Sequence, residues 1–308
     1  MTAAQTTAAQ TTASIHRIPN RGPMTELSIT AIDATVGAVV TGVRLAQLDR
    51  ATWRAIEAAF HERAVLVFPG QHLTDAEQVA FATRFGALED IAGFTGVTPI
   101  TNVTRDGRFR SPDEPSMQIL RGNEGWHTDS SYLPVSAKAS MLSAHVVPGS
   151  GGTTEWADMR AAYDELSAAM KQRLDTLSAF HSIKYSQAKI GFTDTSVGSY
   201  GFDVVNPPRR PLVKVHPVTG RSALFIGRHA YGVNGLSEAE SESLLADLLD
   251  HACRSPRTYE HQWVPGDLVM WDNRCVLHRA RPYNPTEPRI MHHTRVAGDA
   301  LTERAINL

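Results

Sequence analysis

Short apolar runs separated by turn residues recur along most of the chain. Six of these runs have the length and the β-branched or aromatic content of strands, and they are residues 27–33, 64–70, 210–216, 222–227, 259–264 and 267–273. Turns are predicted between strands at HPVTGR (216–221) and VPGD (264–267). The pattern therefore favours a protein built mainly from strands.

Fewer segments place their apolar residues at the spacing of an amphipathic helix, and they are residues 52–63, 75–86, 158–170 and 237–253. The last segment opens with Ser237 and Glu240 at the spacing of a capping box, which predicts where the helix begins. These helices do not alternate regularly with strands, so a doubly wound sheet is disfavoured. We predict a mainly β fold, a β-sandwich or jelly roll, with helical insertions.

The N-terminal segment differs from the rest of the chain. Residues 1–25 contain the near-repeat TAAQTTAAQTT and little apolar surface, which predicts a disordered tail, and Met24 is an alternative start of the reading frame. We expect residues 26–308 to form one domain. The start has neither the charged nor the apolar region of a secretory signal, which predicts a cytoplasmic protein.

Composition narrows the possible partners. The chain has 308 residues, 42% of them hydrophobic, and 30 basic against 32 acidic residues give a formal charge of -2. This balance does not favour nucleic acid or a membrane surface, and it leaves a small ligand as the expected partner. Cys253 and Cys275 are too few and too far apart for a disulfide framework, so we expect two ordinary thiols.

A candidate metal site comes from two separate motifs. His127 and Asp129 form an HxD triplet, whose side chains point to the same face on an extended strand. His278 in VMWDNRCVLHRA is the best candidate for a third ligand. Two histidines and one carboxylate are the facial triad of non-haem Fe(II) oxygenases. Catalytic zinc is the alternative, although the chain has neither HExxH nor a cysteine pair.

An arginine that could bind a carboxylate follows the third candidate ligand in the sequence. Arg289 lies eleven positions after His278. Its planar guanidinium can donate two parallel hydrogen bonds to a carboxylate. 2-Oxoglutarate needs such an anchor at its far end while its keto-acid end chelates iron, so the combination predicts a 2-oxoglutarate-dependent enzyme.

Four ordered blocks carry a resemblance to a known family. The segments WHTDSSY, GGTTEWADMRAAYDEL, VKVHPVTGRSALFIG and VMWDNRCVLHRA through PRIMHHTRVAGD resemble the TauD/TfdA family of Fe(II)- and 2-oxoglutarate-dependent dioxygenases, over about residues 27–298. The resemblance implies a double-stranded β-helix core and iron ligands His127, Asp129 and His278. It also implies that Thr154 and Arg289 bind 2-oxoglutarate, with O₂ as the second cosubstrate.

Within that family the chain is most similar to aryloxyalkanoate dioxygenases, particularly the (S)-selective phenoxypropionate enzymes. The stretches MRAAYD, YSQAK, IGRHA, HQW and WDNRC carry this likeness. An arginine that binds sulfonate in the taurine enzymes would fall at position 293, which is His293 here. Taurine is therefore disfavoured as a substrate.

Several residues are candidates for binding an anionic substrate. Arg295 lies two residues after His293, on the same predicted strand face, and is the first candidate, with a rim charge or oligomer contact as the alternative. The further candidates, each with an ordinary structural role as its alternative, are Asn123, Arg228, His229 and Tyr231. Of the neighbours His292 and His293, at most one faces the pocket, since adjacent strand residues point to opposite faces.

The predicted reaction is hydroxylation of a small anionic substrate, with release of succinate and CO₂. Hydroxylation of a 2-aryloxypropionate at its ether-bearing carbon gives a hemiketal, which collapses to a phenol and a 2-keto acid. Asp129 argues against the related halogenases, which lack this carboxylate. The alternatives are the same oxidation of an alkylsulfonate, an alkyl sulfate or an amino-acid-derived metabolite, or a non-catalytic sensor of iron or 2-oxoglutarate. A homo-oligomer is also expected.

Overall fold

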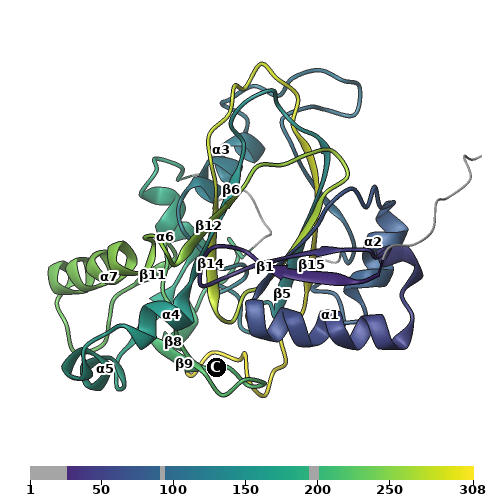
Figure 1. Ribbon diagram of the computed structural model, residues 1–308. Coiled ribbons are helices and arrows are strands. Elements are labelled where there is room, and N and C mark those ends of the chain that lie inside the picture. Colours follow the sequence, from purple (N-terminus) through teal and green to yellow (C-terminus); the bar gives the residue numbers. More distant parts are fainter. Residues whose placement is uncertain (1–25, 91–93, 194–200) are drawn as a thin grey trace, which may run out of the picture.

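The computed structural model describes residues 26–90, 94–193 and 201–308, and the predicted N-terminal tail lies outside these ranges. Strands fill the middle of the molecule, with α1 (Arg50–Arg63) and α2 (Asp75–Ala82) on one side and α7 (Glu238–Ala252) on the other (Figure 1). No helix in the described part of the chain is long and apolar enough to cross a membrane.

The larger sheet has seven strands in the order β1-β2-β3-β13-β5-β15-β4. Their bounds are Ser28–Ala31 (β1), Ala38–Thr41 (β2), Val65–Phe68 (β3), Leu268–Asp272 (β13), Ala139–Val146 (β5), Ile290–Val296 (β15) and Thr98–Thr101 (β4). All neighbours are antiparallel except β2 and β3. The register of β5 and β15 pairs Ser140 with Arg295 and Leu142 with His293.

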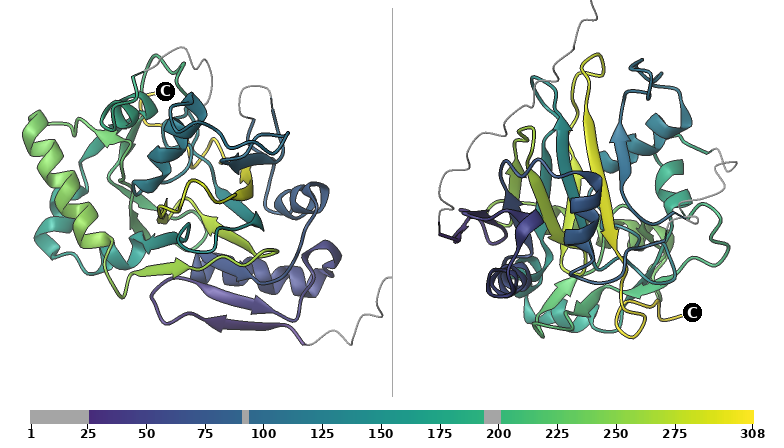
Figure 2. Two further views of the ribbon diagram at one scale, coloured as in Figure 1. Left: turned by 90° about the horizontal axis from the view of Figure 1, so that it is seen from above. Right: turned by 90° about the vertical axis from the view of Figure 1, so that its right-hand side faces the viewer.

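A smaller sheet faces the larger one. Its strands are β12 (Thr258–His261), β6 (Thr154–Asp158) and β14 (Val276–Ala280), in that order. Trp156 of β6 meets Trp271 of β13 across the interior, with ring centroids 5.7 Å apart. The two layers are visible edge-on (Figure 2), and they confirm the predicted jelly-roll core.

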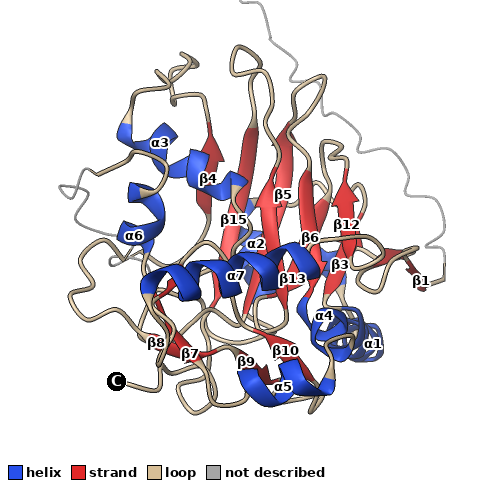
Figure 3. Cartoon of the chain, turned by 90° about the vertical axis from the view of Figure 1, so that its left-hand side faces the viewer, coloured by secondary structure: helices blue, strands red, loops and turns tan. Residues whose placement is uncertain are grey.

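Shorter strands and helices extend one end of this core. A three-stranded sheet joins β11 (Ala230–Tyr231), β7 (Ser178–His181) and β8 (Arg209–Pro211), and a hairpin joins β9 (Val213–Val215) and β10 (Ser222–Leu224). The remaining helices are α3 (Pro115–Arg121), α4 (Met159–Asp164), α5 (Ala168–Leu174) and α6 (Ile183–Ala188), with 3₁₀ turns at Leu45–Gln47 and Gly122–Glu124. Figure 3 shows α7 crossing in front of the sheets, α3 and α6 on the left, and α5 at the bottom near β9 and β10.

The helix predictions are confirmed with one correction. The capping box of Ser237 and Glu240 begins α7 as expected. Residues 158–170 form two helices rather than one, because Ser167 caps a new helix by accepting a hydrogen bond from the backbone N–H of Met170. An apolar pattern cannot reveal such a break when the spacing continues through it.

Successive side chains of β5 point alternately into two hydrophobic cores, one on each face of the larger sheet. Met141 points outward and packs with Phe60 of α1, Phe81 of α2 and Met270 of β13, all buried. Leu142 points inward to the core between the two sheets, which includes Trp156 and Trp271. Burying each large apolar side chain stabilises the fold by about 1.5–3 kcal/mol. The larger sheet is thus fixed on both faces, which gives inward-pointing residues a rigid support. Both cysteines are free.

Candidate metal centre and its cavities

His127, Asp129 and His278 converge between the two sheets. One potential ligand atom from each lies within 4.8 Å of the other two, and all three side chains are buried. Two backbone hydrogen bonds pair the motifs: the N–H of His127 donates to the carbonyl of His278 at 3.0 Å, and the N–H of His278 donates back at 2.8 Å. The predicted convergence of these residues is therefore present.

The HxD motif does not lie on a regular strand, contrary to the prediction. Only His127 forms a β-bridge, and Asp129 begins a turn. Ser130 is in the left-handed region, with a φ of 56°, and its carbonyl accepts a hydrogen bond from Leu133. Because of this turn, the chain leaves β14 directly after Asp129.

Hydrogen bonds fix the orientation of the Asp129 carboxylate. Ser140 of β5 donates to Oδ2 of Asp129 at 2.6 Å and accepts from the side-chain amide of Asn273 at 2.8 Å. The Oδ1 atom of Asn273 accepts from the backbone N–H of Asp129 and from the indole of Trp271. Sequence reasoning missed Ser140 and Asn273, since a serine in a buried strand and an asparagine in a hairpin carry no motif of their own.

The protonation states suit a metal. Burial lowers the pKa of His127 to about 4 and that of His278 well below its usual value, so both imidazoles are neutral at pH 7. Burial alone would raise the pKa of Asp129, but His278, His293 and Arg295 outweigh it and hold the pKa well below the usual range. The cluster thus offers two neutral imidazoles and one carboxylate.

The ring of His127 is oriented for ligation. Its Nδ1 lies 2.8 Å from the carbonyl of Gly125, to which it can donate only when it carries the proton. Nε2 then keeps its lone pair. A histidine held by a carbonyl in this way is typical of metal ligands, and two imidazoles with one carboxylate are the donor set that Fe(II) takes in oxygenases. The residues present fit an iron ion.

A cavity of about 50 Å³ opens beside these three residues. Two further predicted residues line it, Thr154 of β6 and Arg289 directly before β15. Thr154 accepts a hydrogen bond from the indole of Trp263 at 3.0 Å. Arg289 is 5% exposed, and its Nε has no hydrogen-bond partner among the described residues. A buried guanidinium with an unused donor favours an anionic ligand.

Two neighbouring cavities meet the first one at Asn123. One of about 270 Å³ shares Asn123 and Arg289 with it and extends under α3. Another of about 10 Å³ is lined by Asn123, Arg228 and His229 together with His127 and Asp129. Asn123 therefore lies where all three cavities join.

The side chain of Arg228 packs directly against Gly122 and Gly125, close to Asn123. A Cβ at Gly122 would lie 2.2 Å from a terminal nitrogen of Arg228, and a Cβ at Gly125 would lie 3.0 Å from its Cδ. One guanidinium nitrogen donates to the carbonyl of Ser186 at 2.8 Å, and Ser186 also bonds His229. Burial lowers the pKa of Arg228 to about 10, which still leaves it charged at pH 7.

The other substrate candidates lie in different surroundings. His293 lines the metal cavity, stacks on Trp271 and places its Nε2 3.6 Å from Oδ2 of Asp129. Arg295 shares its strand face but lines none of the three cavities, because it pairs with the buried Glu89 at 3.2 Å and with Ser130 at 2.8 Å. Tyr231 stacks on Tyr185 and does not line them either.

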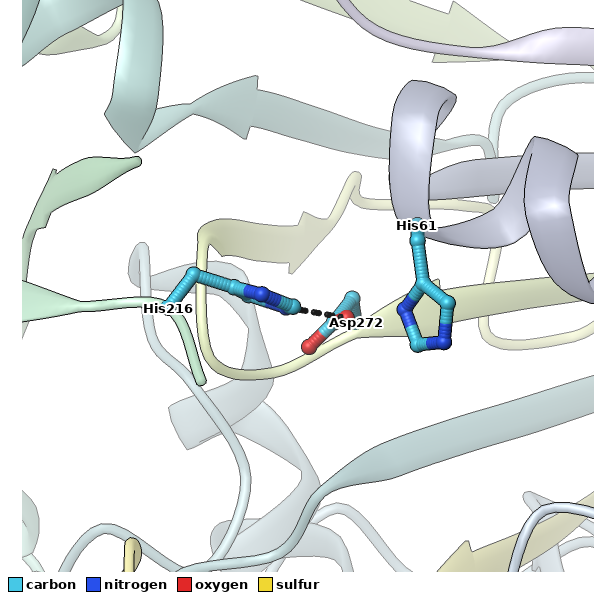
Figure 4. Close-up of side chains that lie close together, drawn as sticks. All are labelled: His61, His216 and Asp272. Carbon is cyan, nitrogen blue, oxygen red and sulfur yellow. Dashed lines mark hydrogen bonds and ion pairs between the residues drawn. The ribbon is translucent and has the colours of Figure 1, made fainter. Parts of the chain in front are cut away.

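A second cluster has metal-binding residue types, but its carboxylate is already paired, and its half-buried member His61 has no hydrogen-bond partner for Nδ1 among the described residues. His61, His216 and Asp272 lie close together at the end of β13 (Figure 4). The guanidinium of Arg274 donates to both carboxylate oxygens of Asp272, at 2.8 and 2.6 Å. Nδ1 of His216 accepts from two backbone N–H groups, so its Nε2 carries the proton that bonds Asp272. This cluster fixes the hairpin between β13 and β14.

Known proteins share both the sequence and the fold. A (S)-phenoxypropionate/alpha-ketoglutarate-dioxygenase of Sphingobium herbicidovorans is 53% identical, over 90% of this chain and 97% of the relative. A protein of the same description from Delftia acidovorans is 50% identical, over 91% and 98%. The crystal structure of AAD-2 in complex with Mn(II) and N-oxalylglycine matches with a TM-score of 0.84 and 38% identity, covering 92% of this chain and 99% of that one.

A family model, described as the taurine catabolism dioxygenase TauD, TfdA family, matches residues 28–296. The match spans both sheets and all the candidate metal ligands, and the relatives extend over nearly the whole chain. On this basis the chain belongs to the taurine catabolism dioxygenase TauD, TfdA family and is an Fe(II)- and 2-oxoglutarate-dependent dioxygenase.

Proposed function

We propose that His127, Asp129 and His278 hold the catalytic iron, and that the enzyme cleaves the ether bond of a 2-aryloxypropionate. The observation that carries the metal assignment is the meeting of two neutral imidazoles and one ionised carboxylate within 4.8 Å. Three ligands on one side leave the remaining positions to cosubstrates. When bound, iron and 2-oxoglutarate together activate O₂ and supply the oxidant.

In this proposal Arg289 and Thr154 bind 2-oxoglutarate. Arg289 is buried at the edge of the metal cavity and has an unused donor, Nε, toward a carboxylate. The Thr154 hydroxyl accepts from Trp263 and therefore keeps its own proton for donation to a ligand oxygen. The AAD-2 structure, which holds Mn(II) and the dicarboxylate N-oxalylglycine, supports a site for a divalent ion and a dicarboxylate.

Arg228 is our first choice for the residue that binds the substrate carboxylate. It lines a cavity together with the metal ligands His127 and Asp129, and Asn123 and His229 flank it there. Arg295 becomes a weaker candidate because Glu89 already compensates its charge, and we assign it to holding the turn after Asp129. His293 is assigned to packing beside Asp129, and Tyr231 to the wall outside the cavity.

One oxygen atom of O₂ enters succinate as 2-oxoglutarate loses CO₂, and the other is inserted into the C–H bond of the ether-bearing carbon of the substrate. The resulting hemiketal breaks the bond between this carbon and the aryl oxygen, and its hydroxyl proton passes to that oxygen, which gives a phenol and pyruvate. Arg228 holds the carboxylate so that this C–H bond faces the metal, and the cavity of about 270 Å³ that joins at Asn123 offers room for the aryl group.

A substrate panel tests the proposal. The enzyme is loaded without oxygen with Fe(II) and 2-oxoglutarate, then given O₂ with each enantiomer of a 2-aryloxypropionate, a phenoxyacetate, taurine or an alkyl sulfate. We expect substrate-dependent succinate with the aryloxyalkanoates, and preferentially with the (S)-enantiomer, as the names of the two relatives suggest. If only taurine or a sulfate ester is turned over, the alternative substrates, an alkylsulfonate or an alkyl sulfate, are favoured. If no substrate increases succinate formation, a non-catalytic sensor is favoured.

The location of the enzyme in the cell and its oligomeric state belong to the same proposal. We infer that the enzyme is cytoplasmic, because the two cysteines are free, and that it forms a homo-oligomer, as many soluble enzymes do. Size-exclusion chromatography with light scattering tests the second point. A monomeric mass at micromolar concentration would contradict it.

A further inference from the structure

Three metal-binding side chains that the iron site does not use meet on the outer face of the larger sheet. His145 is the penultimate residue of β5, His292 lies on β15 and Asp75 is the first residue of α2. One potential ligand atom from each lies within 4.8 Å of the others. His292 points away from the iron site, since its neighbour His293 points into it. The group is therefore separate from the catalytic centre.

Both imidazoles keep a ring nitrogen that can bind a metal. Nδ1 of His292 donates to Oδ1 of Asp75 at 2.6 Å, which leaves Nε2 without a proton in the neutral ring. Ser143 donates its own proton to Gln78 and so accepts from Nε2 of His145 at 3.2 Å, which leaves Nδ1 of His145 without one. The two rings lie 3.8 Å apart between centroids.

Among the described residues, the ion pair of Asp75 is with His292 and not with a lysine or arginine. Burial lowers the pKa of His145, which favours the neutral ring that a metal needs. Asp75 and Glu77 place two carboxylates in the first turn of α2 and offset the positive end of the helix. His61, His216 and Asp272 differ in this respect, because Arg274 occupies the carboxylate there.

We propose that Asp75, His145 and His292 form a second divalent-cation site, suited to Zn²⁺, with water completing the coordination. Zinc accepts imidazole nitrogen and carboxylate oxygen in this number and combination. His145 is exposed and Asp75 is 61% exposed, so an ion can reach the site from solvent. Asp75 would turn from Nδ1 of His292, to which it is hydrogen-bonded without metal, toward the ion.

The site joins α2 to the two strands that support the active site. Gln78 of α2 already donates to the carbonyl of His292 and to the hydroxyl of Thr294. A bound ion would add a second connection between this helix and β15. It should consequently stabilise the folded protein, because a ligand that binds only the native state raises the melting temperature.

Equilibrium dialysis of the metal-free, full-length enzyme against ZnCl₂ tests the proposal. We expect two zinc equivalents for the wild type, one for the His145→Ala/His292→Ala variant, and one for the His127→Ala/Asp129→Ala variant, in which only the outer site remains. In that second variant, zinc should raise the melting temperature, and adding His145→Ala and His292→Ala should abolish the rise.

His251→Ala is the matched control, since His251 is a half-buried histidine of α7 that belongs to neither cluster. It should keep two equivalents. Two equivalents in the His145→Ala/His292→Ala variant would overturn the proposal, as would no bound zinc in the His127→Ala/Asp129→Ala variant. Circular dichroism of each variant confirms that it is folded before the zinc is counted.

Discussion

Ser140 determines where one oxygen of the Asp129 carboxylate points. Its hydroxyl lies 2.6 Å from Oδ2, in a buried environment where a hydrogen bond to a charged group contributes about 1.5–3 kcal/mol. We expect Ser140→Ala to weaken Fe(II) binding about 10- to 100-fold, the range typical when a group that orients a metal ligand is lost. Titration of the metal-free protein with Fe(II) under nitrogen measures this change.

Ser143→Ala is the control for that substitution. Ser143 lies on the same strand but on the opposite face, where it bonds Gln78. The control should bind Fe(II) as the wild type does. Equal Fe(II) affinity in Ser140→Ala and the wild type would show that Ser140 does not position the carboxylate.

Gly122 makes room for Arg228, which leads to a specific test of the anion site. Gly122 is buried, and a Cβ there would meet the end of the Arg228 side chain at 2.2 Å and Nε2 of the buried Gln187 at 2.5 Å. Gly122→Ala should therefore raise the KM for the anionic substrate several-fold and also lower the melting temperature, because overpacking a buried site costs about 1–3 kcal/mol.

A double-mutant cycle separates this effect from others. In an Arg228→Leu background, Gly122→Ala should change the KM no further, because the group it displaces is gone. Additive effects of the two substitutions would mean that Gly122 acts through something other than Arg228.

At the residue scale, the side chains singled out by motif or by resemblance lie together, whereas those that support them were missed. The five singled-out residues line one cavity, and their roles stay predictions: His127, Asp129, His278, Thr154 and Arg289. Ser140 and Asn273 could not be predicted, because their importance depends on which strand lies beside which. For Arg295 the strand face was predicted, but its pairing with Glu89 was not, because Glu89 is more than 200 positions away in sequence.

The hairpin of β13 and β14 carries His278, and a buried ion pair holds its turn. Arg274 and His216 both bond Asp272, which is fully buried. Asp272→Asn would leave the charge of Arg274 uncompensated, and breaking such a buried pair costs about 3–5 kcal/mol. We expect a loss of this size in the free energy of unfolding, measured by urea denaturation of the metal-free protein.

An exposed pair on α7 provides the comparison. Asp250 pairs with Arg254 four residues later, and both side chains are mostly exposed. Asp250→Asn should change the free energy of unfolding by less than about 1 kcal/mol, as is usual for surface pairs. Equal losses in the two variants would contradict a structural role for the Asp272 cluster.

At the element scale, long segments with a clear period were predicted and short ones were missed. α2 and α7 lie within the predicted segments, although α2 ends at Ala82, before the predicted residue 86, and α1 begins at Arg50, two residues before its predicted start. α3 and α6 have seven and six residues, too few to be stable without packing, so their sequences carry little helical signal. These two short helices are the ones next to the substrate cavities, which explains why that wall was not foreseen.

Buried histidines make the whole molecule sensitive to acid. Burial lowers the pKa of His61 to about 4, and that of His181, whose two ring nitrogens have no hydrogen-bond partner among the described residues, well below 6.5. The unfolded chain takes up a proton at each histidine near pH 6.5, whereas the folded protein does so only at lower pH. Stability is therefore greatest above pH 6.5 and falls as the pH drops through this window.

The buried, unpartnered His181 should lower the free energy of unfolding as the pH falls from 7 to 5, and the half-buried His61 should lower it less. Urea denaturation of the metal-free protein across this range measures the slope. In a His181→Leu variant the slope should be smaller. A free energy of unfolding that does not change between pH 7.5 and pH 5 would contradict this account.

At the scale of the whole molecule, the strand-rich pattern indicated a β-sandwich or jelly roll, and the resemblance specified the double-stranded β-helix. The pattern could not show that the larger sheet extends to seven strands, because β1 and β2 join it through a parallel pairing set by tertiary contacts. The predicted tail at residues 1–25 lies outside the described part of the chain and stays a prediction.

The most direct test of the central claim is the stoichiometry of a single reaction. With Fe(II), 2-oxoglutarate, O₂ and (S)-2-phenoxypropionate, the enzyme should release phenol, pyruvate and succinate in equal amounts, and Asp129→Ala should release none of them. Succinate without phenol from the wild type, or phenol that forms equally well in Asp129→Ala, would contradict iron-dependent ether cleavage at this site.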